Sequence, residues 1–190
     1  HRPVPDIEGF DGWQTFQQDA ARLAEITLSF FHPRMGDSVE PRGMVTSAVM
    51  HTVWPGRMQW LEYEGVPLLL DAAHNPSGME AVCEQLRNQM ENNIHPTPGV
   101  IILGSTPQTN LIAFLHPLIE LIVAGEVEHV IVTEPQKGRR AAVPTAEIAA
   151  ELGAQGVPAK VEQVPDPEKA LERALELAKG DPAQPVLAFG

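Results

Sequence analysis

Hydrophobic positions change their spacing along the chain, and this change divides it into two parts. In residues 14–31 apolar side chains recur with helical spacing, which predicts a helix. A polar, turn-rich stretch follows at residues 32–43, and residues 44–53 predict a second, short helix. From residue 57 onward short runs with strand spacing appear. The first part is therefore predicted to be helical, and the second to contain a sheet.

The second part alternates strands with helices. Residues 57–65 alternate apolar and polar positions, and residues 66–72 form a continuous apolar run, so we expect two strands joined by a hairpin at Gly65. Further strands are predicted at residues 99–104, 128–134, 159–165 and 185–190, and helices at residues 75–92, 110–125, 144–156 and 166–181. Pro117 predicts a break or kink in the helix over residues 110–125.

This alternation is typical of an α/β fold. Strands that alternate with helices form a mostly parallel sheet with helices on both faces. We therefore expect a Rossmann-like sheet of about six strands, in which the strand at residues 57–63 pairs antiparallel at one edge.

Composition and charge exclude several classes of partner. The 190 residues carry a net charge of −12 with a pI of about 4.9, which disfavours binding to nucleic acid and to anionic membrane surfaces. No apolar run approaches the roughly 20 residues that span a bilayer. Cys83 is the only cysteine, which excludes an intrachain disulfide and fits a reducing compartment, so we expect a cytoplasmic protein. The seven histidines show no spacing typical of metal ligands, and we expect no metal site within the chain.

Polar side chains gather where the run at residues 66–72 ends. Asp71 follows this strand, and His74, Asn75 and Pro76 then begin a helix. In open parallel sheets ligands bind beyond the carboxyl ends of the strands, and a helix N-terminus favours anions. Asp and Asn are also common as plain caps at strand-to-helix turns, so both interpretations remain open on local physics.

Two motifs resemble the C-terminal domain of folylpolyglutamate and dihydrofolate synthases, which are ATP-dependent, amide-forming enzymes of the Mur ligase family. The first is "WPGR" at residues 54–57, and the second is "LLLDAAHNPSG" at residues 68–78. The order and spacing of the two motifs match the family pattern. Ala72 departs from that pattern, because it stands where the family usually has a glycine. The closing "VLAFG" resembles the family's last strand.

The resemblance implies a domain organisation. It assigns residues 1–53 to the tail of a central ATPase domain with linker helices, and residues 54–190 to the Mur ligase C-terminal domain. The chain begins with His1 and stops on an apolar run, so we expect a piece of a longer protein. The parent is expected to be monomeric, whereas the piece could form a dimer through its exposed N-terminal helix.

The resemblance also implies a reaction and its ligands. ATP with Mg²⁺ would phosphorylate the carboxylate of a folate or of dihydropteroate, and L-glutamate would then attack the acyl phosphate. Arg57 is implied to reach the ATP phosphates, Asp71 to lie by the ribose, and Asn75 to border the nucleotide. His74 is implied to position nucleotide or glutamate. None of these residues is implied to be a covalent nucleophile.

The segment "EPQKGRR", residues 134–140, adds a basic spot to an acidic chain. It follows a predicted strand, so it should lie at the same edge of the sheet as His74. Lys137 and Arg140 are therefore candidates for binding phosphate or an acidic folate tail. A solvated loop without a ligand is the alternative.

Two departures from the family pattern keep other functions open: Ala72, and "STPQTN" at residues 105–110, which replaces an Asp-Lys-Asp element. The resemblance places the phosphate-binding G-x-x-x-x-G-K-[ST] loop in the family's central domain, and this loop does not occur in these residues. We therefore expect residues 1–190 alone not to catalyse ligation. A non-catalytic binding module of the same fold and a ligase for cell-wall peptides are the alternatives to a folate enzyme.

Overall fold

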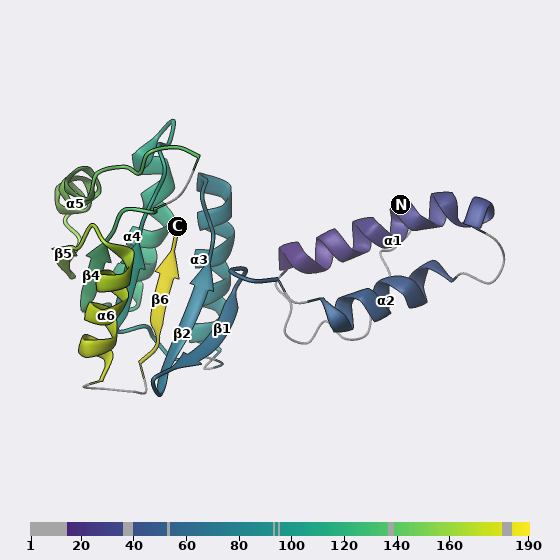
Figure 1. Cartoon of the computed structure of the whole chain (residues 1–190), viewed down its shortest axis with the longest axis horizontal. Helices are drawn as coiled ribbons and strands as arrows, with labels where there is room; N and C mark the ends of the chain where they lie inside the picture. The colour runs from purple at the N-terminus through teal and green to yellow at the C-terminus, as the bar shows by residue number, and fades with distance from the viewer. Residues whose placement is uncertain are drawn as a thin grey trace. The chain divides into compact units, whose positions relative to one another are not determined.

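Two helices make up one unit of the chain, and a sheet with its covering helices makes up the other (Figure 1). The computed structural model describes residues 15–35, 40–52, 54–92, 94, 96–136, 139–179 and 184–190. The two units divide between Trp54 and Pro55. Helices α1 (Thr15–Met35) and α2 (Pro41–His51) form the first unit and contact each other.

The prediction for α1 places its end too early. The helix continues to Met35, four positions beyond the predicted end at residue 31. The polar, turn-rich composition of residues 32–43 predicted a break, but the end of a helix is the part of it that local sequence predicts least well. The predicted second helix is confirmed as α2, which begins three residues earlier, at Pro41.

The second unit contains the predicted sheet. Its six strands are β1 (Gln59–Tyr63), β2 (Val66–Asp71), β3 (Val100–Leu103), β4 (His129–Val132), β5 (Lys160–Gln163) and β6 (Val186–Phe189). They lie in the order β1-β2-β6-β3-β4-β5, and every neighbouring pair is parallel except β1 with β2. The predicted α/β fold with an antiparallel edge strand is therefore confirmed.

A tight turn joins β1 to β2. Glu64 and Gly65 both have positive φ, 51° and 79°, as a two-residue hairpin turn of the I′ type requires. Gly65 adopts this conformation without steric cost, because it lacks a Cβ. The turn fixes the antiparallel register, which pairs Tyr63 with Val66.

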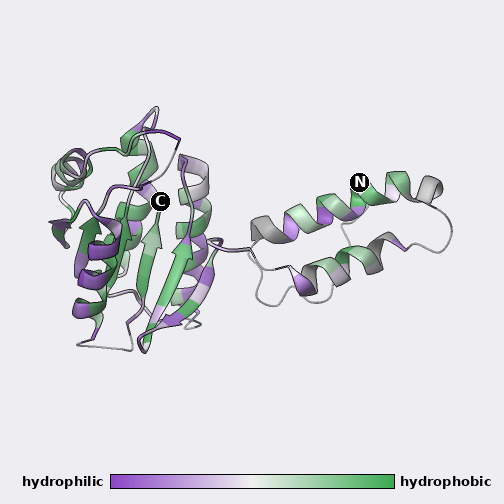
Figure 2. Cartoon of the chain, in the orientation of Figure 1, coloured by the Kyte–Doolittle hydropathy of each residue, from purple (hydrophilic) through white to green (hydrophobic). Residues whose placement is uncertain are grey.

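Helices cover both faces of the sheet, as predicted. One buried cluster joins one sheet face to α3 (Pro76–Glu91), α4 (Leu111–Ala124) and α5 (Thr145–Ala154). A second cluster joins the opposite face to α6 (Pro167–Ala178). Figure 2 shows hydrophobic central strands, β2 and β6 among them, and a helix α6 whose visible side is largely hydrophilic.

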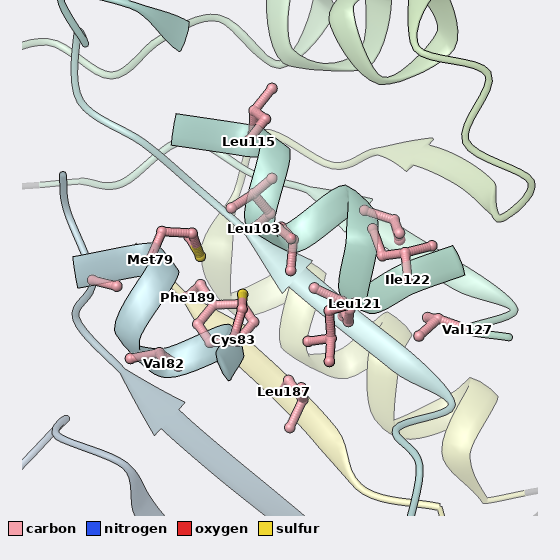
Figure 3. Close-up of a cluster of buried hydrophobic side chains, with 14 of the residues drawn as sticks. Met79, Val82, Cys83, Leu103, Leu115, Leu121, Ile122, Val127, Leu187 and Phe189 are labelled. Atoms are coloured by element: carbon pink, nitrogen blue, oxygen red, sulfur yellow. The ribbon is translucent and has the colours of Figure 1, made fainter. Parts of the chain in front are cut away.

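The core between α3, α4 and the sheet is closely filled. Met79, Val82 and Cys83 of α3 face side chains of α4 and of the central strands (Figure 3). Helix α4 continues through Pro117, so the helix is not broken there, and the kink stays a prediction. A proline inside a helix removes one backbone hydrogen bond. Here Phe114, Leu118 and their neighbours are fully buried, and this packing offsets the loss.

Candidate functional site

The carboxyl end of β2 leads into the N-terminus of α3 through four residues without regular structure, residues 72–75. Asn75 is the N-cap of α3, and its Oδ1 accepts from the backbone N–H of Gly78 at 2.8 Å and from the Ser77 hydroxyl at 3.0 Å. Pro76 occupies the first helical position, where its missing N–H costs nothing. The predicted cap is confirmed, so the side-chain oxygen of Asn75 already has partners within the chain.

Asp71 lies inside the domain. The residue is only 4% exposed, and its Oδ2 accepts a hydrogen bond from the backbone N–H of Met58 at 2.8 Å. Burial raises the pKa of this carboxyl, while the Met58 N–H and the nearby Arg57 act in the opposite direction. The carboxylate therefore ties the turn at Met58 to the end of β2. Its contact with a ribose stays a prediction.

The turn that carries Arg57 has an unusual backbone. Gly56 has φ +66° and Met58 has φ 45°. Residues other than glycine rarely adopt such angles, and they do so where the surroundings hold them. Here the bond from Met58 to Asp71 and the bond from the Ala72 N–H to the Gly56 carbonyl, 2.8 Å, fix the turn.

The departure at Ala72 does not strain the chain. Ala72 is absent from the residues with positive φ, so an alanine fits its backbone conformation. The Cβ of Ala72 also has room beside Gly56. A Cβ built on Gly56 would lie 3.9 Å from it, an ordinary van der Waals distance. The usual glycine is therefore not needed at this position.

Arg57 and His74 meet at one backbone oxygen. Arg57 Nη1 donates to the Ala72 carbonyl at 3.1 Å, and His74 Nδ1 lies 3.0 Å from the same oxygen. Because a carbonyl only accepts, Nδ1 of His74 carries a proton. The ring of His74 is exposed and Arg57 is half-buried. A cation and an imidazole thus stand side by side next to the N-terminus of α3, where negative charge is favoured.

Arg57, Asp71, His74 and Asn75 form a group that we call the cluster at Ala72, and sequence reasoning missed one residue that contacts it. Gln108, in the loop between β3 and α4, donates to the carbonyl oxygen of His74 at 3.1 Å. The only signal in the sequence was its place after a strand that ends at the same edge of the sheet. The altered "STPQTN" loop therefore contacts the site.

The basic segment after β4 is only partly described. Lys137 lies outside the described residues. Arg140 is exposed, and no hydrogen bond or ion pair within the described part of the chain joins it to the cluster at Ala72. Glu134 of the same loop accepts from the Thr145 N–H at the start of α5, at 3.1 Å. The structure therefore brings Arg57, Asp71, His74 and Asn75 together, and the roles of Lys137 and Arg140 stay predictions.

An apolar cavity lies on the α6 side of the sheet. It measures about 420 Å³ and is lined mainly by aliphatic residues, Leu68, Leu70 and Ile102 among them, with Asp71 and Thr133 as polar side chains. Among the residues that the structure describes, no cationic side chain lines it. Its described lining is therefore mostly apolar.

The described residues contain no group of three or more His, Cys, Asp or Glu that could hold a metal ion. The cluster at Ala72 thus fits phosphate oxygens by its donors but does not fit Mg²⁺ by its own side chains. No helix within the described ranges combines the length and the apolar character that a membrane span requires.

A family model identifies the family of this chain. The family model described as "Mur ligase, glutamate ligase domain" matches residues 56–190. Comparison with curated proteins gives no match.

Three solved structures illustrate the likeness in fold. The folylpolyglutamate synthase of Mycobacterium tuberculosis, complexed with ADP and AMPPCP, is 21% identical with a TM-score of 0.62, over 80% of this chain and 33% of that chain. The bifunctional folylpolyglutamate synthase/dihydrofolate synthase of Yersinia pestis, complexed with AMPPNP and Mn ion, is 20% identical with a TM-score of 0.57, over 80% and 32%. E. coli FolC in complex with DHPP and ADP is 17% identical with a TM-score of 0.55, over 78% and 31%. The chain spans about a third of the length of each.

Proposed function

Since the chain belongs to the Mur ligase family and contains its glutamate ligase domain, we propose that it serves an ATP-dependent ligase that adds L-glutamate to folates, to dihydropteroate, or to both. The family supports a ligase, and the structural neighbours are folate enzymes. The observation that carries the proposal is the convergence of Arg57 and His74 on the Ala72 carbonyl, beside the N-terminus of α3.

Arg57 is the residue proposed to bind phosphate. A guanidinium has five N–H donors, and its one hydrogen bond within the described residues, to Ala72, leaves most of them available for phosphate oxygens. Its half-buried position strengthens a charge-assisted hydrogen bond relative to bulk water. The turn fixed by Asp71 holds this side chain in place before a ligand arrives.

His74 and Asn75 have different proposed roles. With Nδ1 bonded to Ala72, the Nε2 atom of the exposed His74 ring is the one that can meet nucleotide or glutamate. Asn75 holds the first turn of α3, and so it keeps the helix N-terminus beside the nucleotide. When bound, ATP would supply the phosphoryl group that activates the substrate carboxylate. The residues described here bind and orient, and none of them is proposed to form a covalent intermediate.

Calorimetric titration with AMPPNP and magnesium chloride tests the nucleotide site. We expect weak binding to residues 1–190 and a loss of about tenfold in affinity for Arg57→Ala, because a charge-assisted hydrogen bond is removed. Arg173→Ala, which removes an arginine on α6, should bind as the wild type does. The result would count against the proposal if both arginine variants bound equally well.

A turnover assay addresses the reaction. With ATP, L-glutamate and a reduced folate, we expect no product from residues 1–190 alone, since they hold no phosphate-binding loop sequence. Robust product would overturn this expectation. A parent protein that binds nucleotide but ligates a cell-wall peptide, or that ligates nothing, would instead favour the two alternative functions.

A further inference from the structure

Gln108 links the β3–α4 loop to the β2–α3 loop. Its Nε2 lies 3.1 Å from the His74 carbonyl oxygen, 2.9 Å from the Thr106 carbonyl oxygen and 3.1 Å from Ser105 Oγ. Ser105 is 2% exposed, and its hydroxyl donates to the Thr106 carbonyl at 2.8 Å. Because a carboxamide nitrogen has only two protons, these three acceptors fully engage it. Gln108 is thus held at its own loop while it reaches the other.

The β2–α3 loop depends on such bonds for its shape. The Ala72 N–H donates to the Gly56 carbonyl, and the Ala72 carbonyl accepts from Arg57 and from His74. Gln108 engages the carbonyl of His74 itself. Hydrogen bonds of this kind restrict the conformations that a segment without regular structure adopts. The bond from Gln108 therefore fixes the backbone from which the imidazole projects.

We propose that Gln108 is a positioning residue for His74. It holds the His74 backbone so that Nδ1 stays bonded to Ala72 and Nε2 points toward the ligand. Gln108 then affects nucleotide affinity only through His74. The part of this inference that concerns the ligand rests on the proposed function, whereas the part that concerns the imidazole rests on geometry alone.

Three substitutions separate the donor from the shape of the side chain. Gln108→Glu keeps the size but replaces the N–H donor by a carboxylate oxygen, which faces the carbonyl oxygens of His74 and Thr106 and repels them. Gln108→Ala removes the side chain without introducing repulsion. It replaces Gln108→Glu in the test if that variant folds poorly. Gln108→Lys restores a donor of similar reach. Gln155→Ala is the matched control, because Gln155 bonds Glu151 on α5.

Long-range ¹H–¹⁵N spectra of the histidine rings provide the first readout, with His74 assigned from its missing signals in His74→Ala. In the wild type we expect the neutral ring to carry its proton on Nδ1. In Gln108→Glu and Gln108→Ala the ring nitrogen shifts should move toward a mixture of both neutral forms. Gln108→Lys and Gln155→Ala should keep the wild-type shifts. A role in stability alone would leave the His74 signals of the folded variants unchanged, and that result would overturn the proposal.

Titration with AMPPNP and magnesium chloride provides the second readout. Gln108→Ala should weaken binding about fivefold, the size of one hydrogen bond. In the His74→Ala background it should weaken binding no further, since the two effects act through one group. A full additional loss there would overturn the inference. If the wild type binds no AMPPNP, the proposed function fails, and the ring spectra still decide whether Gln108 positions His74.

Discussion

At the scale of single residues, the cluster depends on one shared acceptor. The Ala72 carbonyl accepts hydrogen bonds from Arg57 and His74, and the Ala72 N–H donates to the Gly56 carbonyl. Asp71 stabilises the same turn, because its carboxylate accepts a hydrogen bond from the Met58 N–H. Functional side chains held by bonds to backbone are already oriented when a ligand arrives, so less conformational entropy is lost on binding.

Asn75→Ala should lower the free energy of unfolding by about 1 kcal/mol, because the Gly78 N–H at the start of α3 loses its partner. Asn75→Asp keeps an acceptor and should stay close to the wild type. Asn88→Ala, on the exposed surface of α3, is the control and should change stability little. Urea unfolding measures all three, and an Asn75→Ala variant as stable as the wild type would contradict the assigned cap.

At the scale of elements, an ion-pair network fastens the edge strand β5 to α6. Arg173 of α6 donates to Glu162 of β5 from Nε at 2.9 Å and from Nη2 at 3.2 Å. Lys160 lies 3.1 Å from the same carboxylate. These hydrogen bonds lower the pKa of Glu162 to about 2, with the bond from Arg173 as the largest cause. Because β5 pairs only with β4 in the sheet, this network adds a second attachment for the edge.

Glu162→Gln should lower the free energy of unfolding at pH 7 by about 0.5–1 kcal/mol, the usual range for pairs near the surface. Since the pKa of Glu162 is lower in the folded state, its contribution is present above about pH 4.5 and disappears as the pH falls toward 2. The wild type and the variant should therefore converge over this window. Glu172→Gln, on the exposed side of α6, is the control, and stability curves that stay parallel would contradict the account.

The elements also show where sequence reasoning succeeds. The Asn75-Pro76 and Asp166-Pro167 pairs predict the starts of α3 and α6, because both caps act within a few residues. The end of α1 was predicted too early and α4 is not broken at Pro117, since helix ends and prolines depend on packing as well as on local sequence.

At the scale of the whole molecule, the fold brings distant loops to one edge of the sheet. Gln108 bonds His74 across 34 positions of sequence, and spacing alone cannot predict such a contact. The order of the strands places β3 beyond β6, two strands from β2, so the two loops meet only through topology. The sequence therefore predicted that Asp71, His74 and Asn75 gather at the β2–α3 turn. The contact from the β3–α4 loop through Gln108 became visible only in the structure.

The location of the nucleotide is the most direct test of the account. Backbone ¹H–¹⁵N spectra of residues 1–190 should be recorded while AMPPNP and magnesium chloride are added. The account predicts that shifts concentrate at residues 56–58, 72–78 and 105–108, and that Arg57→Ala, with its roughly tenfold lower affinity, makes them much smaller at the same nucleotide concentration. Shifts confined to α6 and the apolar cavity beside it, or unchanged by Arg57→Ala, would contradict it.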